Sequence, residues 1–102
     1  MYDRRQHRRV SLARPIWVQQ GSRYDESKLA FDVGEGGLRM ERLGVAVDAQ
    51  LQLVLPLPAG QRRGCLVRGR VVWKRMHATG IQFVDPSAEA LRAIREHVEA
   101  TG

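Results

Sequence analysis

The sequence predicts an all-β fold with one C-terminal helix, in which a six-stranded antiparallel barrel is capped by that helix. Six short runs of alternating apolar and polar residues follow one another, and turns containing glycine or proline separate them. One amphipathic segment follows the last run. A chain of 102 residues is long enough for one domain with a modest core, and six short antiparallel strands can close into a small barrel.

The expected strands are defined by period-two alternation and by the residues that interrupt it. They cover residues 15–19, 28–33, 37–41, 50–57, 65–74 and 80–84. Gly21 ends the first strand, and Pro58 and Gly60 follow the fourth. Within the fifth strand we expect Gly69 to mark a bulge or bend, because glycine weakens a regular ladder.

The C-terminal helix is expected to begin at Asp85-Pro86-Ser87, where a capping residue precedes a proline. Leu91, Ile94 and Val98 then recur at helical spacing over about 13 residues. Their shared face predicts a helix that covers one opening or face of the barrel.

Both tryptophans, Trp17 and Trp73, are predicted to be core residues. Trp73 shares its strand face with Val67 and Val71, and Cys65 occupies a core-like position on that face. A lone cysteine cannot form an internal disulfide, which fits a cytoplasmic location.

The net charge of +6 is concentrated at the N-terminus, where residues 1–14 contain five arginines and one aspartate. We interpret residues 1–14 as a flexible arginine-rich arm and residues 15–102 as the barrel with its helix. A second basic stretch covers residues 62–75. Such charge indicates an anionic partner without identifying it.

Two short segments carry what a guanine nucleotide would need. The arm contributes four closely spaced arginines: Arg4, Arg5, Arg8 and Arg9. Guanidinium groups can fork onto the O6/N7 edge of guanine, stack on the base and neutralise phosphate. The turn segment (residues 31–38) contains one aspartate and three glycines: Asp32, Gly34, Gly36 and Gly37. Its carboxylate can accept the donors on the opposite guanine edge, and we expect its glycines to be required by the backbone angles of a tight turn.

Each segment also has a simpler interpretation. The arm could be a solvated basic tail, and the turn segment could be an ordinary glycine-rich hairpin in which Asp32 bonds its own turn backbone. The strands between and after the two segments favour one joint site instead, because barrel closure would bring both halves together.

The two segments resemble the motifs of the PilZ domain family, bacterial receptors for cyclic di-GMP. The family pattern is an RxxxR arm followed by a [D/N]xSxxG turn. Arg5 and Arg9 match the arm motif, and Asp32 and Gly37 match the turn motif. Gly34 stands where the pattern has serine. The resemblance extends from residue 3 to residue 98 and includes the Gly-x-x-Phe of residues 80–83.

The resemblance implies a role for each matching residue. Arg5 and Arg9 would grip the Hoogsteen edge of guanine and the phosphates, and Asp32 would face guanine N1–H and N2–H. Arg4 or Arg8 would add charge or stacking. The implied ligand-binding residues are Arg4, Arg5, Arg8, Arg9, Asp32, Gly34 and Gly37.

The glycine at position 34 is expected to weaken binding of the nucleotide. A lost side-chain hydrogen bond costs about 0.5–1.5 kcal/mol, or about 1.5–3 kcal/mol when it serves a charged group. That loss corresponds to roughly 2- to 100-fold in affinity. Backbone contacts at Gly34 would survive. If the site is a weakened version of the family's site, Gly34→Ser should tighten binding.

Three functions fit these observations. The first is a non-catalytic cyclic di-GMP receptor whose arm orders on binding and so signals to a protein effector. The second is a PilZ-like interaction module that no longer binds the nucleotide, which the change at Gly34 favours. The third is a basic nucleic-acid-binding barrel. Aromatic residues form 6% of the chain and do not interleave with the basic ones, which disfavours a nucleic-acid partner.

No catalytic residue, metal site or cofactor is expected beside the ligand cyclic di-GMP. The histidines His7, His77 and His97 are scattered, and Cys65 has no second thiol with which to hold a metal. No apolar run approaches the length of a membrane span.

Overall fold

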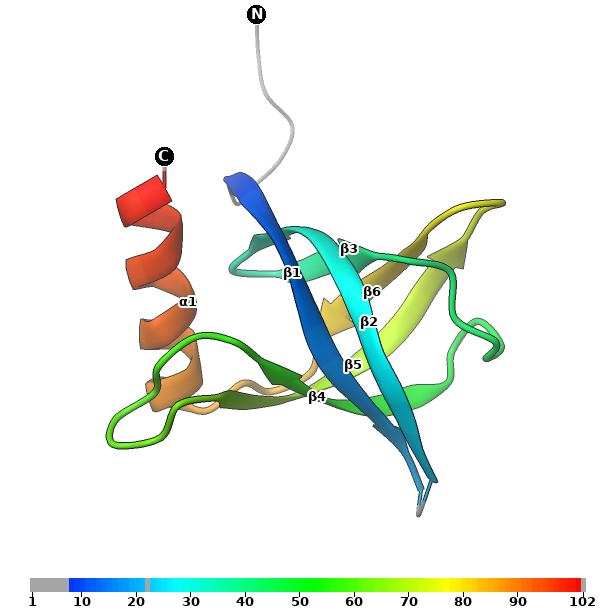
Figure 1. Cartoon of the computed structure of the whole chain (residues 1–102), viewed down its shortest axis with the longest axis horizontal. Helices are drawn as coiled ribbons and strands as arrows, with labels where there is room; N and C mark the ends of the chain where they lie inside the picture. The colour runs from blue at the N-terminus through cyan, green and yellow to red at the C-terminus, as the bar shows by residue number, and fades with distance from the viewer. Residues whose placement is uncertain (1–7, 22, 102) are drawn as a thin grey trace, which may run out of the picture.

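Six antiparallel strands close into a barrel in the order β1-β2-β3-β6-β5-β4, and one helix lies beside it (Figure 1). The computed structural model describes residues 8–21 and 23–101, with only the backbone described for residues 23–27. The strands and the helix are β1 (Arg9–Gln20), β2 (Arg23–Gly34), β3 (Gly37–Met40), β4 (Gln50–Leu55), β5 (Cys65–Lys74), β6 (Thr79–Phe83) and α1 (Ala88–Thr101). The predicted fold class is confirmed.

Strand β1 begins six residues earlier than expected, at Arg9. Val10 and Leu12 are buried, with 8% and 6% of their surface exposed, and Val10 pairs with Val33 of β2. Residues 9–14, which we assigned to the arm, therefore belong to a barrel strand. The apolar alternation of the strand continues through them, and the pairing with β2 provides their backbone hydrogen bonds.

The first tryptophan was wrongly assigned to the core. Ile16 and Val18 are fully buried, so the alternation of β1 places Trp17 on the outer face, with 53% of its surface exposed. Two apolar neighbours point inward and leave no inward position for the residue between them.

The second tryptophan also lies outside the buried core, for a different reason. The register between β5 and β6 shifts between Val71 and Trp73, and Trp73 is paired with Gly80. A Cβ atom on Gly80 would lie 2.2 Å from the indole ring, so the ring occupies the space that a side chain at position 80 would need. Gly69, where we expected the bulge, pairs regularly with Leu51. The extra residue sits further along the strand, and it changes the face on which Trp73 lies.

Helix α1 packs its apolar face on the barrel, near the start of β1 (Figure 1). Its buried residues are Ala90, Ala93, Ile94 and Val98. The cap is Ser87, whose Oγ accepts a hydrogen bond from the Ala90 amide at 3.1 Å, rather than the expected Asp85. Asp85 has a positive φ of 45° and lies in the connection before the helix.

The helix also covers Cys65, which is fully buried and has its Sγ 3.8 Å from the carbonyl oxygen of Ala90. Burial, and secondarily the negative charge of Glu89, raises the pKa of this thiol. The folded chain therefore holds the thiol proton more tightly than the unfolded chain does.

The free energy of unfolding should fall as the pH rises past the ordinary thiol pKa of about 8.5, at up to about 1.4 kcal/mol per pH unit. Urea unfolding between pH 7 and pH 10 measures this slope. Cys65→Ala is the control, because its loss of packing is independent of pH. Equal slopes for the two proteins would contradict the prediction.

Candidate functional site

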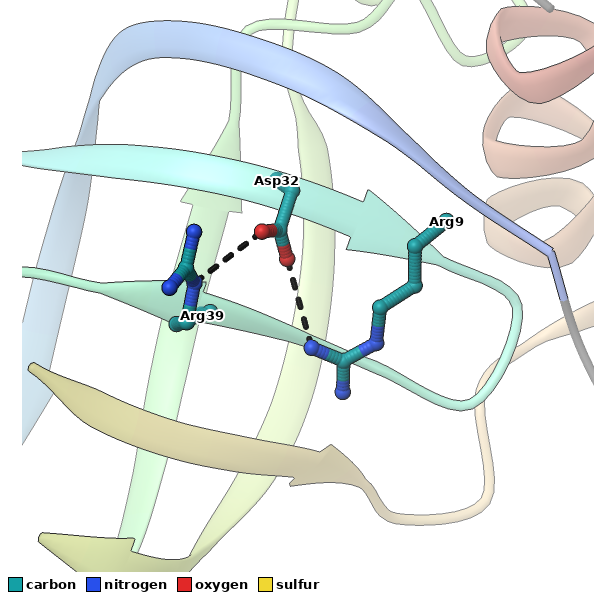
Figure 2. Close-up of polar contacts among 3 residues, drawn as sticks. All are labelled: Arg9, Asp32 and Arg39. Carbon is teal, nitrogen blue, oxygen red and sulfur yellow. Dashed lines mark hydrogen bonds and ion pairs between the residues drawn. The ribbon is translucent and has the colours of Figure 1, made fainter. Parts of the chain in front are cut away.

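A partly exposed carboxylate, that of Asp32, lies between two guanidinium groups on the outer face of the barrel (Figure 2). Arg9 Nη1 donates to Oδ1 at 3.3 Å, and Arg39 Nε donates to Oδ2 at 3.0 Å. The Asp32 side chain is 21% exposed, and those of Arg9 and Arg39 are 32% and 47% exposed. A ligand can thus reach this cluster, in which each carboxylate oxygen already has an N–H donor.

Strand register places the three residues together. Asp32 lies opposite Ser11 of β1 on one side and opposite Arg39 of β3 on the other. Arg9 is two residues before Ser11, on the same side of β1, and its long side chain returns along the sheet to Asp32. The structure thus brings together one residue of each motif, Arg9 of the arm motif and Asp32 of the turn motif.

Arg39 was missed in the sequence, although a signal for it was present. Strands β2 and β3 are joined by two residues, 35 and 36, so pairing outward from this link places residue 32 opposite residue 39. Arg39 also lies over the Phe31 ring, with its Cζ 5.5 Å from the ring centroid. Two contacts, one ionic and one with an aromatic face, therefore hold this guanidinium beside Asp32.

Gly34 and Gly37 are required because neighbouring backbone leaves no room for a Cβ atom. We had expected their backbone angles to require glycine, and that expectation was wrong. The glycines with positive φ in the described part of the chain are Gly21 and Gly60. A Cβ atom on Gly34 would lie 2.6 Å from the backbone oxygen of Arg8, and one on Gly37 would lie 2.0 Å from the backbone oxygen of Ile81. Strand β1 approaches the turn segment from one side and β6 from the other.

Helix α1 contacts both halves of the site. Arg95 Nε donates to Glu35 Oε1 in the turn segment. His97 Nε2 lies 3.3 Å from the carbonyl oxygen of Ser11, which is opposite Asp32. The C-terminal helix is therefore in contact with the two strands that carry the carboxylate and its Arg9 partner.

The remaining predicted site residues have different positions. Arg8 is exposed beside Arg9, at the start of the described chain. Arg4 and Arg5 lie outside the described residues, so their roles stay predictions. Across residues 8–21 and 28–101, whose side chains are described, no group of three or more His, Cys, Asp or Glu side chains could hold a metal ion. Helix α1, the helix in the described part of the chain, is not long and apolar enough to cross a membrane.

The cluster favours a planar ligand that is also an anion. One carboxylate and two guanidinium groups leave an excess positive charge, and Arg8 adds to it. The carboxylate can accept two adjacent N–H donors, while guanidinium groups can donate to ring acceptors and to phosphate oxygens. No group in the cluster is arranged as a nucleophile with a base beside it.

Comparison with known proteins supplies a family and a fold. The model of the PilZ domain family matches residues 3–100. The inhibitor of motility MotI/DgrA of Bacillus subtilis has a similar structure, with a TM-score of 0.79 and 16% identity over 97% of this chain and 51% of that one. PlzA of Borreliella burgdorferi, solved in complex with c-di-GMP, has a TM-score of 0.66 and 14% identity over 94% of this chain and 41% of that one. The chain thus spans about half the length of these proteins or less, and no curated protein matches it.

The close approach of β1 to Gly34 leads to a prediction about stability. Gly34→Ala would place a methyl carbon 2.6 Å from the Arg8 oxygen, so the start of β1 must move away. We expect a loss of about 1–3 kcal/mol in the free energy of unfolding, as for other overpacked sites. Amide hydrogen exchange should also become faster at residues 10–12.

Gly44→Ala is the matched control, because a Cβ atom there would have nothing within 4 Å. Equal exchange rates at the start of β1 in both variants would contradict the close approach.

Proposed function

The chain belongs to the PilZ domain family, and on that premise we propose that it is a non-catalytic receptor domain for cyclic di-GMP. The observation that carries the proposal is the ion pair between Arg9 and Asp32, 3.3 Å long, which joins the arm motif to the turn motif. The two segments that could form a guanine site are thereby in direct contact. The complex of PlzA with c-di-GMP supports the choice of ligand.

Asp32 is the residue that would recognise guanine. Its two oxygens accept N–H groups from two arginines in the free chain. The N1–H and N2–H groups of guanine form a planar pair of donors of the same kind as a guanidinium fork. Guanine can therefore replace Arg9 on the carboxylate without leaving the aspartate unpaired, which keeps the cost of exchange low.

Arg9, once released, would bind the ligand itself. Its side chain is 32% exposed and begins at the first residue of β1, so it can turn toward a base or a phosphate above Asp32. A guanidinium group binds guanine O6/N7 or a phosphate in a bidentate manner. Arg8 is exposed beside it, and Arg4 and Arg5 precede both, which matches a ligand with two phosphates.

The exchange would also provide the signal to a protein effector. Replacing Arg9 on Asp32 changes the position of the side chain at which the predicted arm enters the barrel. Helix α1 contacts the same region through Arg95 and Glu35. Ordering of the arm on the nucleotide would then alter the surface that an effector contacts.

A second function, an interaction module without the nucleotide, is favoured by Gly34. A serine at position 34 would place its Cβ atom 2.6 Å from the backbone oxygen of Arg8, so Gly34→Ser should displace the start of β1, which opposes our expectation that it tightens binding. Equilibrium binding decides between the two functions. The full chain should bind cyclic di-GMP in isothermal titration calorimetry, and absence of binding at high micromolar nucleotide would favour the module.

Arg9→Ala should weaken cyclic di-GMP binding by about 10- to 100-fold, because it removes a charge-assisted contact of about 1.5–3 kcal/mol. Calorimetric titration measures the change. Arg92→Ala is the matched control, since Arg92 is an exposed arginine on α1 and carries the same charge. Equal affinities of the two variants would overturn the role of the arm motif.

Arg39→Ala should weaken cyclic di-GMP binding by no more than about 5-fold, a smaller loss, because Arg39 orients Asp32 through an exposed ion pair worth about 0.2–1 kcal/mol. Calorimetric titration at one salt concentration measures the change, because salt would screen the exposed Arg39–Asp32 ion pair as well as the general charge. Arg42→Ala, at an exposed arginine just after β3, is the control. If both variants lose the same affinity, Arg39 contributes charge alone.

A further inference from the structure

The outer face formed by β1, β4 and β5 carries an exposed apolar row. Trp17 pairs with Val54, and Val54 pairs with Leu66. Trp17 and Leu66 are 53% and 52% exposed, and Val54 lies half-buried between them. An exposed tryptophan and an exposed leucine on either side of this valine form a continuous apolar row on a solvent-facing sheet, which is typical of a binding surface.

The next row on this face is polar and carries one charge. Gln19 pairs with Gln52, and Gln52 pairs with Arg68. Arg68 is exposed, and its guanidinium makes no ion pair or hydrogen bond within the described part of the chain. We call these two rows the tryptophan face, which consists of Trp17, Gln19, Gln52, Val54, Leu66 and Arg68.

The tryptophan face borders two hollows that can receive side chains. One hollow, of about 280 Å³, is lined by Leu66, Arg68 and Pro86 among others, with Asp85 also on its wall. The other hollow, of about 200 Å³, is lined by Gln19 and Arg68 among others. Arg68 thus lies on the wall of both, beside an exposed leucine.

The composition of the tryptophan face is typical of the centre of a protein interface. Tryptophan and arginine are enriched at such centres, whereas lysine, aspartate and glutamate are depleted. The six residues of the face include none of the depleted types. Nucleic acid is disfavoured, because one guanidinium group is a small charge for a phosphate backbone.

We infer that the tryptophan face docks a protein segment that carries a carboxylate close to a large apolar side chain. Leu66 and Arg68 are two residues apart on β5 and point to the same side, about 6.5–7 Å apart along the strand. An extended segment with an acidic residue two positions from an apolar one matches this spacing. The tryptophan face of a second copy of the chain does not match, because it contains no acidic residue that could pair with Arg68.

The inference deepens the proposed function, and rests on it, because it names the surface and the chemistry that an effector would use. Strand β1 carries both Arg9 of the candidate site and Trp17 of the tryptophan face. The nucleotide and the effector segment would therefore bind to different parts of one strand.

Panning a phage-displayed library of random peptides on the full chain, with and without cyclic di-GMP, tests the inference. We expect enrichment of peptides with Asp or Glu two positions from Phe, Trp or Leu. A synthetic peptide of the most enriched sequence should bind at least about 10-fold more weakly to Trp17→Ser and to Arg68→Glu, as expected for loss of a central contact.

Two control variants match these substitutions in chemistry. Met76→Ser removes an apolar side chain that is 75% exposed outside the face, and Arg92→Glu reverses a charge on α1. Both should keep the affinity of the peptide. The positions in all four variants are exposed, so thermal melting should stay close to that of the unmodified chain.

Three results would overturn the docking inference: enriched peptides without acidic residues, equal binding by face and control variants, or a wild-type dimer that Trp17→Ser dissociates in sedimentation. Titration of cyclic di-GMP in parallel keeps the two proposals separate. A chain that selects acidic peptides but binds no nucleotide would overturn the receptor function alone. A chain that binds the nucleotide but selects no such peptide would overturn the docking surface alone.

Discussion

The close approach of backbone at Gly34 and Gly37 is the constraint on which the candidate site depends. The hairpin of β2 and β3 lies between β1 and β6, and at both contacts a Cβ atom would be closer than 3 Å to a backbone oxygen. Because no side chain separates the strands there, β1 can begin beside Gly34 and still direct Arg9 to Asp32. The two glycines therefore let the neighbouring strands approach, and this approach places Arg9 beside Asp32 in the absence of any ligand.

Most of the barrel could be predicted from the alternation of apolar residues and from the turn residues. The register of the β2–β3 hairpin could also have been predicted. The two-residue link after β2 pairs residue 32 with residue 39, so the position of Arg39 beside Asp32 could have been predicted from the sequence. The start of β1 was harder to predict. Its register with β2 shifts between Ser11 and Arg14, and Ala13 has a positive φ of 48°, so the alternation is interrupted at the place where the arm becomes a strand.

The two tryptophans show what local patterns cannot determine. Trp17 is exposed because Ile16 and Val18 fill the inward positions, a fact that follows from alternation once β1 is extended. Trp73 changes face because of a register shift between β5 and β6, which depends on how two distant segments pair. We assigned both tryptophans to the core because large apolar side chains are usually buried. The strand register, which decides the face on which each residue lies, outweighed that preference.

Strand β1 carries outward residues that belong to two distinct surfaces. The strand pairs with β2 from residue 9 to residue 20, and with β4 only at residues 17–19, where the barrel closes. Near its start, Arg9 pairs with the carboxylate that we propose for guanine recognition, and further along, Trp17 belongs to an apolar row next to Arg68. The register shift between Ser11 and Arg14 lies between the two surfaces, so they occupy separate parts of one strand and can bind different partners.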